Sequence, residues 1–252
     1  ALIGAYQEDG NGALKALLPI AGRTLVEYQA RCASAAGAAP IVVLVERVPT
    51  SLAQAFERLR SEGISVVPVS DPNEAAARFE TGMPILQIAD GVAPIMSVVE
   101  QMSEADERVV ATVPDDERHQ GFERIDNDRR WAGLALVDGG TLSSTAAMLG
   151  DWDLQSTLLR RTIQAGAALA PVPEGATPFL PEADGTGAAF DRDGALALAG
   201  RADAGVLGQL LAHPYLAVPP PKSLDRLDFD RALAAAGLDA LSPADGAATL
   251  VA

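Results

Sequence analysis

Short apolar runs alternate with amphipathic stretches along the first half of the chain. The apolar runs have the length and the β-branched content of buried strands. Strands are expected at residues 1–6, 40–45 ("PIVVLV"), 64–69 ("ISVVPV") and 84–90 ("PILQIAD"). Helices are expected between them, at residues 24–36, 50–60 and 73–80. This order predicts an α/β fold, a three-layer sandwich in which helices cover both faces of a mostly parallel, Rossmann-like sheet.

The pattern changes after residue 107. Two further strands, "RVVATVP" at 108–114 and "RRWAGLALVD" at 129–138, are separated by a polar hairpin at 115–128. Residues 150–167 predict a helix whose apolar face carries leucines at positions 154, 158 and 159. The acids of "DWD" at 151–153 are interpreted as the N-cap and an adjacent charge of this helix.

A Pro/Gly-rich segment separates this part from the rest of the chain. The stretch "PVPEGATPFLPEADGTG" at 171–187 holds four prolines and three glycines in 17 residues, more than packed elements tolerate. We therefore predict a domain over 1–172, a linker over 173–184, and a small, mainly helical segment over 185–252.

Composition restricts the function classes. A net charge of −15 argues against nucleic acid as a partner, because phosphate contacts need clustered lysine and arginine. No apolar run approaches the roughly 20 residues that cross a bilayer, and the N-terminus lacks signal-peptide features, so the expected location is the cytoplasm. A single cysteine and two histidines make a thiolate or histidine metal cluster improbable.

The segment "KALLPIAGRTLVEYQARCASAAGAAPIVVLV", followed by "ILQIADGV", resembles the GT-A-like nucleotidyltransferase superfamily, which includes the MobA-like NTP transferases. The resemblance covers residues 1–170. It implies that loop glycines, here Gly10 and Gly12, donate backbone amides to a triphosphate. It also implies that Lys15 neutralises phosphate charge during catalysis and that Asp90 holds Mg²⁺.

Both side chains suit these roles chemically. A lysine near transferring phosphates stabilises charge that grows in the transition state, and a carboxylate at the carboxyl edge of a sheet is a hard ligand for Mg²⁺. The alternatives are that Lys15 is a solvated loop lysine and that Asp90 forms a turn before Gly91. Arg23 is expected to cap the start of the first helix or to pair locally there.

The loop "YQEDGNGAL" departs from the family pattern. It offers no arginine, and it places Glu8 and Asp9 where phosphates would bind. Two like charges about 5 Å apart at an effective dielectric constant near 20 repel by roughly 3 kcal/mol, which weakens binding about a hundredfold. The domain is therefore expected to be a degenerate member of the superfamily, active or not.

From residue 185 onward, "FDRDG", "HPYLAVPPPKSLDR" and "DGAATL" resemble an internal piece of the 1,6-anhydro-N-acetylmuramic acid kinases, ATP-dependent enzymes of cell-wall recycling. Lys222 and Ser223 follow three prolines that hold the backbone extended, so they are candidate substrate-binding residues, with a structural turn as the alternative. The phosphate-binding segment and catalytic aspartate of that family have no counterpart in residues 1–183. Two incomplete resemblances in one chain indicate a composite or truncated gene product.

Three functional hypotheses follow. The first is a transferase that moves a nucleotidyl group from an NTP, with Mg²⁺, to a small phosphorylated acceptor; it predicts Lys15 and Asp90 in one crevice. The second is an anhydrosugar kinase represented by a fragment, which requires an actin-like lobe upstream. The third is a non-catalytic nucleotide-binding or regulatory module, which predicts an acidic cleft lined by Glu8 and Asp9. We take the first as the leading hypothesis.

Overall fold

A computed structural model describes residues 1–20, 23–173, 176–178 and 180. The expected helical segment over 185–252, most of the expected linker, and the candidate residues Lys222 and Ser223 lie outside the described residues.

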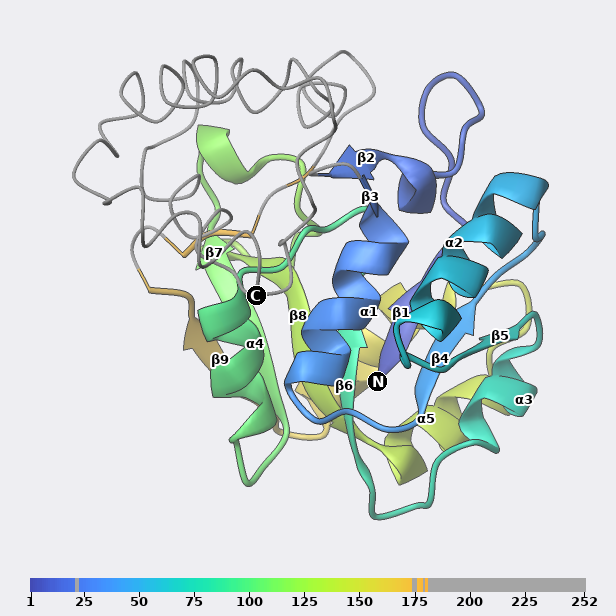
Figure 1. Ribbon diagram of the computed structural model, residues 1–252. Coiled ribbons are helices and arrows are strands. Elements are labelled where there is room, and N and C mark those ends of the chain that lie inside the picture. Colours follow the sequence, from blue (N-terminus) through green and yellow to red (C-terminus); the bar gives the residue numbers. More distant parts are fainter. Residues whose placement is uncertain (21–22, 174–175, 179, 181–252) are drawn as a thin grey trace, which may run out of the picture.

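The fold is built on a seven-stranded sheet with the strand order β5-β4-β1-β6-β8-β7-β9 (Figure 1). A separate two-stranded ribbon, β2-β3, follows the first loop. The strands are β1 (Leu2–Gly4), β2 (Pro19–Ile20), β3 (Arg23–Thr24), β4 (Ile41–Leu44), β5 (Val66–Val69), β6 (Pro84–Ile88), β7 (Val109–Pro114), β8 (Arg129–Asp138) and β9 (Ala168–Pro171).

Most neighbouring strands in the sheet run parallel. The pairs β5–β4, β4–β1, β1–β6 and β7–β9 are parallel, whereas β8 is antiparallel to both β6 and β7. The antiparallel β7–β8 pair is the hairpin expected around residues 115–128. The predicted α/β fold with a mostly parallel sheet is confirmed.

Helices cover both faces of the sheet, so the molecule has three layers. In Figure 1, α1 and α4 lie in front of the sheet and α5 lies behind it. Helix α1 also contacts α2, and α5 also contacts α3 and α6. The helices are α1 (Leu25–Ala35), α2 (Thr50–Ser61), α3 (Pro72–Ala76), α4 (Met96–Ser103), α5 (Gly139–Ala146) and α6 (Leu154–Gln164), with 3₁₀ turns η1 (Lys15–Leu17) and η2 (Glu117–His119).

The central strands are buried because helices exclude water from both of their faces. Leu2 and Ile3 of β1 are fully buried, as are Val42 and Val43 of β4. Strands buried on two faces read as continuous apolar runs rather than as alternating patterns. This is why the sequence indicated them clearly.

The sequence did not predict two of the helices, α4 and α5. Helix α5 begins "GGTLSSTA", a sequence of low intrinsic helix propensity, and it forms because Asp138 caps it by accepting a hydrogen bond from the Thr141 amide. Helix α4 has no side-chain cap, so no capping residue marks its start in the sequence. The expected helix at 73–80 ends at Ala76, after a start capped by Asp71.

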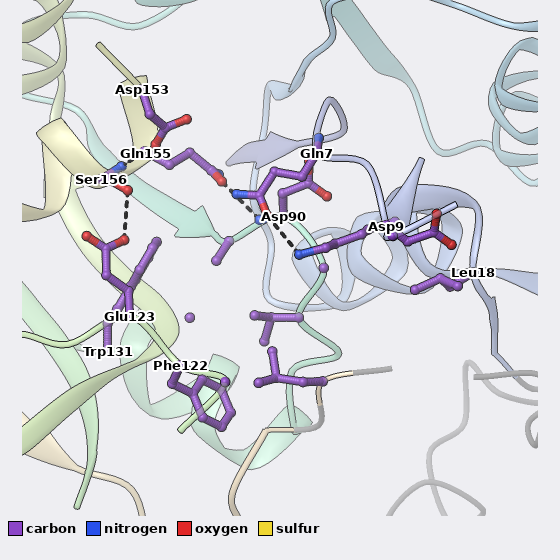
Figure 2. Close-up of a pocket in the computed structure, with 18 of the residues that line it drawn as sticks. Gln7, Asp9, Leu18, Asp90, Phe122, Glu123, Trp131, Asp153, Gln155 and Ser156 are labelled. Carbon is purple, nitrogen blue, oxygen red and sulfur yellow. Dashed lines mark hydrogen bonds between the residues drawn. The ribbon is translucent and has the colours of Figure 1, made fainter. Parts of the chain in front are cut away.

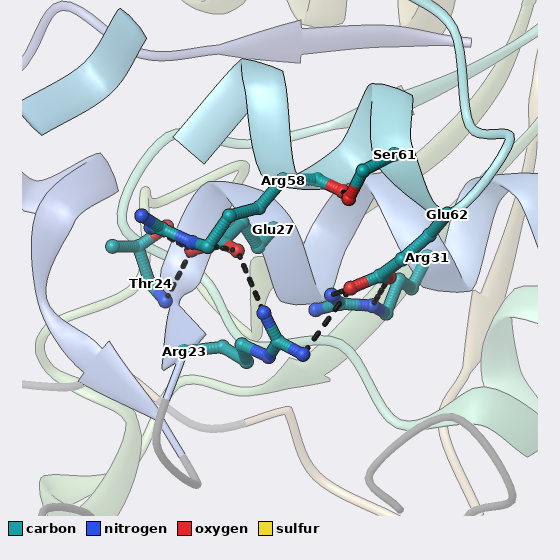
Figure 3. Close-up of polar contacts among 7 residues, drawn as sticks. All are labelled: Arg23, Thr24, Glu27, Arg31, Arg58, Ser61 and Glu62. Carbon is teal, nitrogen blue, oxygen red and sulfur yellow. Dashed lines mark hydrogen bonds and ion pairs between the residues drawn. The ribbon is translucent and has the colours of Figure 1, made fainter. Parts of the chain in front are cut away.

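A network of charged side chains joins α1 to α2 (Figure 3). Glu27 is fully buried, and its carboxylate accepts hydrogen bonds from Arg58 Nε at 2.9 Å and Nη2 at 2.7 Å, and from the Thr24 amide at 3.0 Å. Arg23 pairs with Glu27 at 3.7 Å and with Glu62 at 3.2 Å, which confirms its expected local pairing. Glu27 therefore satisfies groups from α2 and from the start of α1, and the network fixes the α1 N-terminus.

Among the described residues, no helix combines the length and apolarity that crossing a bilayer requires.

The strand order contains a switch point between β1 and β6. From β1 the chain builds outward through β4 and β5, and then returns to place β6 on the other side of β1. In sheets of this kind, ligands bind outside the carboxyl ends of the strands at such a point. We therefore expect a ligand site at the segments that follow β1 and β6.

Candidate functional site

A cavity of about 570 Å³ opens at this switch point (Figure 2). Its walls come from the loop after β1, the turn after β6, the segment around Phe122, strand β8 and the start of α6. The polar and charged residues among those that line it are Gln7, Asp9, Asn11, Lys15, Asp90, Glu123, Asp153, Gln155 and Ser156. Both residues expected to act on a nucleotide, Lys15 and Asp90, are on the wall of this one cavity.

The Asp90 carboxylate bridges the two strands at the switch point. Its Oδ2 accepts hydrogen bonds from the Tyr6 and Gln7 amides, each at 2.7 Å. Its Oδ1 is buried and has no hydrogen-bond partner among the described residues. Burial raises the pKa of Asp90, and the opposing effects of the Gln7 and Tyr6 amides and of Lys15 are too small to cancel it. One oxygen is thus structural, and the other has no protein partner in the described part of the chain.

Two buried glutamines hold the backbone around Asp90. Gln155 accepts a hydrogen bond from the Asp90 amide at 2.9 Å and donates one to the Ile88 carbonyl at 2.9 Å. Gln29 of α1 donates to the carbonyls of Ala89 and Val92 at 2.9 and 2.7 Å. The turn that carries Asp90 is therefore fixed by side chains from both layers of helices.

This arrangement depends on the absence of a side chain at Gly4. A Cβ atom there would lie 2.6 Å from Gln155 Oε1 and 2.9 Å from the Asp90 Cβ. We expect Gly4→Ala to lower the free energy of unfolding by about 1–3 kcal/mol, because both neighbours must move. Denaturant titration checks this, with Gly82→Ala as control, since a Cβ at Gly82 meets nothing within 4 Å. Equal stabilities of the two variants would contradict the prediction.

Lys15 is the one cation among the described residues that line the cavity. Its Nζ donates to Gln7 Oε1 at 3.2 Å, and its stem crosses Gly91, where an added Cβ would come within 2.9 Å of Lys15 Cδ. Gly91 has φ of 77°, a conformation that glycine adopts without strain. The turn after β6 therefore gives both the carboxylate and the space for the lysine.

The opposite side of the cavity is acidic. Asp153 caps α6, as the sequence indicated, because its carboxylate accepts a hydrogen bond from the Ser156 amide at 2.7 Å. It also accepts a hydrogen bond from the Tyr6 hydroxyl at 2.5 Å. Glu123 accepts a hydrogen bond from the Ser156 hydroxyl at 2.8 Å. Figure 2 shows Glu123, Asp153 and Ser156 across the cavity from Asp9 and Gln7. Four carboxylates and one lysine thus line the described walls, an excess of negative charge that favours ligands that carry a cation.

The glycine loop lies only partly on the cavity. Gly10 and Asp9 line it, whereas Gly12 and Glu8 are not among the lining residues. Gly12 donates its amide to the Asp9 carbonyl at 3.1 Å, and Glu8 forms an ion pair with Arg47. Of the acids that the sequence placed near the phosphates, only Asp9 therefore reaches the cavity wall.

Sequence reasoning did not find Gln155, Glu123 or Ser156. Gln155 gave no signal, because a glutamine in the first turn of a helix is ordinary. Glu123 lies in the polar hairpin between β7 and β8, where acids are common. The "DWD" stretch was the available clue, because an N-cap residue at the start of a helix that faces the sheet edge can point into a crevice.

Comparison with known proteins identifies relatives of the C-terminal part. Residues 182–252 match the family model of anhydro-N-acetylmuramic acid kinase. The kinase of that name from Acidiphilium cryptum is 61% identical over 67 residues, which are 27% of this chain and 18% of the relative. The one from Nitrobacter winogradskyi is 57% identical over 67 residues, 27% of this chain and 17% of the relative. The chain thus spans less than a fifth of the length of these relatives.

Two solved structures are similar to the chain. A nucleotidyl transferase from Methanothermobacter thermautotrophicus has a TM-score of 0.46 and 19% identity, over 69% of this chain and 86% of that one. The CTP:phosphocholine cytidylyltransferase from Streptococcus pneumoniae has a TM-score of 0.49 and 14% identity, over 71% of this chain and 91% of that one. Both TM-scores are below 0.5 and both identities below 25%, so no role is taken from these structures. The chain therefore joins an α/β domain to a segment that is similar in sequence to anhydro-N-acetylmuramic acid kinases.

Proposed function

We propose that the cavity binds a nucleoside triphosphate with a divalent cation and transfers its nucleotidyl group to a small phosphorylated acceptor. The observation that carries this proposal is the position of Lys15 and Asp90 on one cavity at the switch point of the sheet. A lysine and a carboxylate on the same wall are the groups that phosphate transfer needs, since one balances phosphate charge and the other holds a metal.

The residues present fit a magnesium ion that arrives with its nucleotide. The buried, unpartnered Oδ1 of Asp90 is a hard oxygen ligand of the kind that Mg²⁺ prefers. In the described part of the chain, no group of three or more His, Cys, Asp or Glu side chains could hold a metal ion. Mg²⁺ usually binds through one or two carboxylates plus substrate phosphates, and keeps several waters. When bound, the ion would neutralise phosphate charge during transfer.

The protein residues would orient the ligand and balance its charge. Lys15, held against Gly91 and hydrogen-bonded to Gln7, would contact the phosphates from the loop side. The Asp90 position is set by the Tyr6 and Gln7 amides, so its carboxylate needs little rearrangement on binding. Such preorganisation lowers the cost of binding and of charge development.

Isothermal titration with CTP, GTP, UTP and ATP in the presence of Mg²⁺ tests the proposal, repeated on Lys15→Ala. We expect one nucleotide to bind, and the substitution to weaken its affinity about tenfold, because a charge-assisted phosphate contact is lost. Arg78→Ala is the control, because Arg78 pairs with Glu74 of α3 and lies outside the cavity lining. Unchanged affinity of the Lys15 variant would remove the role of that lysine, and no binding of any nucleotide would overturn the proposal.

The match of residues 182–252 favours a second candidate, an ATP-dependent anhydro-N-acetylmuramic acid kinase. In that case Lys222 and Ser223 would bind the sugar. Assay of phosphate transfer from ATP to 1,6-anhydro-N-acetylmuramic acid by the full chain separates the two candidates. Nucleotide binding with neither nucleotidyl transfer nor phosphate transfer would instead support a non-catalytic module.

A further inference from the structure

The loop between β1 and η1 is closed around one of its own carboxylates. Asp9 Oδ1 accepts hydrogen bonds from the Asn11 amide at 2.8 Å and from the Ala13 amide at 2.9 Å. The Asp9 amide donates to the Ala13 carbonyl at 2.8 Å, and the Gly12 amide donates to the Asp9 carbonyl at 3.1 Å. Amides that a phosphate-binding loop directs at its ligand are thus used inside the loop.

The two acids of this loop differ in position. Glu8 points away to Arg47, whose Nη2 also donates to the Gly12 carbonyl at 3.2 Å. Asp9, by contrast, lines the cavity together with Gly10 and Asn11. The loop therefore contributes one negative charge to the cavity wall.

We propose that Asp9 is an internal anion that occupies the loop amides and competes with the phosphate groups of the ligand. This inference rests on the proposed function, because it concerns the affinity of that same cavity for phosphate. Asp9 has two effects on an incoming phosphate. It repels the anion through its charge, and it holds the amide of Asn11, a residue of the cavity lining, that would otherwise be free to bind it.

A divalent cation changes this competition. Asp9 repels phosphates that carry no metal, but it attracts a metal ion bound to them. The loss of binding free energy that Asp9 causes is therefore smaller when the ligand carries the metal. Asp9 therefore makes the cavity selective for metal-bound over metal-free polyphosphate. A purely structural role of Asp9 in the loop would give no such dependence on the metal.

Two substitutions separate the charge from the occupied amides. Asp9→Asn removes the charge but keeps an oxygen that can accept the same two amide hydrogen bonds, whereas Asp9→Ala removes both. Inorganic triphosphate and the nucleotides are titrated into the full chain with EDTA and then with Mg²⁺. Without metal, we expect Asp9→Asn to bind about tenfold more tightly than the wild type, and Asp9→Ala at least as tightly. With Mg²⁺, the gain is expected to shrink.

Glu8→Gln is the matched control, because it removes the same charge one residue away and outside the cavity lining. An equal gain in Glu8→Gln, or no gain in either Asp9 variant, would overturn the inference. If the wild type binds a nucleotide and the Asp9 variants bind it with the same affinity, the proposed function stands and this role of Asp9 is refuted. No wild-type nucleotide binding, but new triphosphate binding in Asp9→Asn and Asp9→Ala, would support the role of Asp9 and refute the proposed function.

Discussion

Glu27→Ala is expected to lower the free energy of unfolding by about 2–3 kcal/mol, because it removes hydrogen bonds to a buried charge, while the Arg58 partner is 41% exposed and can be solvated. The carboxylate is fully buried and accepts hydrogen bonds from Arg58 and from the amide and hydroxyl of Thr24. Its removal leaves the first turn of α1 without this acceptor and breaks the Arg58 link between α2 and α1. Because α1 also carries Gln29, which holds the turn after β6, the loss should extend to the cavity.

The same residue gives a pH dependence with a defined sign. Burial pushes the pKa of Glu27 upward, but hydrogen bonds from Arg58 and Thr24 outweigh it and leave the pKa below the ordinary value. A carboxyl whose pKa is lower in the folded state contributes stability above its unfolded pKa of about 4.3, and this contribution is lost as the pH falls through the folded value. The wild type should therefore lose stability on acidification by an amount that Glu27→Ala does not show.

Urea unfolding at neutral pH and at a series of pH values below 5 measures both effects. Glu57→Ala is the control, because Glu57 pairs with Arg60 on the same helix while 65% of its side chain is exposed, and such pairs contribute less than about 1 kcal/mol. If the Glu27 and Glu57 variants lost the same stability, the network between α1 and α2 would not hold the fold in the way described.

The parts of the fold that could be predicted are those whose burial is complete. The strands at 40–45 and 84–90 were evident because both of their faces are covered, and the helices at 24–36 and 50–60 because one face is apolar. The sequence also indicated a sheet with Lys15 and Asp90 at one edge. Helix α5 could not be predicted, since it depends on the Asp138 cap and on contacts with α3 and α6 rather than on its own propensity.

Only some of the site residues could be inferred from the sequence. Lys15 and Asp90 could be inferred because they occupy motif positions, but the support of Asp90 by Gln155 spans 65 residues and follows no local pattern. The acid pair in the first loop suggested simple repulsion of phosphate. The structure separates them, since Glu8 pairs with Arg47 and Asp9 closes the loop. Local sequence gives charge and turn chemistry, whereas the direction of each side chain depends on distant contacts.

Asp90→Asn is expected to weaken the affinity of the cavity for Mg²⁺-nucleotide about a hundredfold at neutral pH, since the loss of a ligating carboxylate removes about 3 kcal/mol of binding energy. The variant keeps an oxygen that can accept the Tyr6 and Gln7 amides, so the sheet edge should stay intact. Titration with Mn²⁺ or Mg²⁺ and the bound nucleotide measures the loss. An affinity within about twofold of the wild type would show that Asp90 holds no metal.

The same substitution should shift stability with pH in the direction opposite to that of Glu27. Burial raises the pKa of Asp90 above that of the unfolded chain, despite the amides of Gln7 and Tyr6 and the charge of Lys15. Its stabilising contribution is therefore complete below an unfolded pKa of about 3.9 and is lost as the pH rises through the folded value. Relative to the wild type, Asp90→Asn should become more stable as the pH increases across this range, in urea unfolding at successive pH values. A difference between Asp90→Asn and the wild type that stays constant with pH would contradict the burial argument.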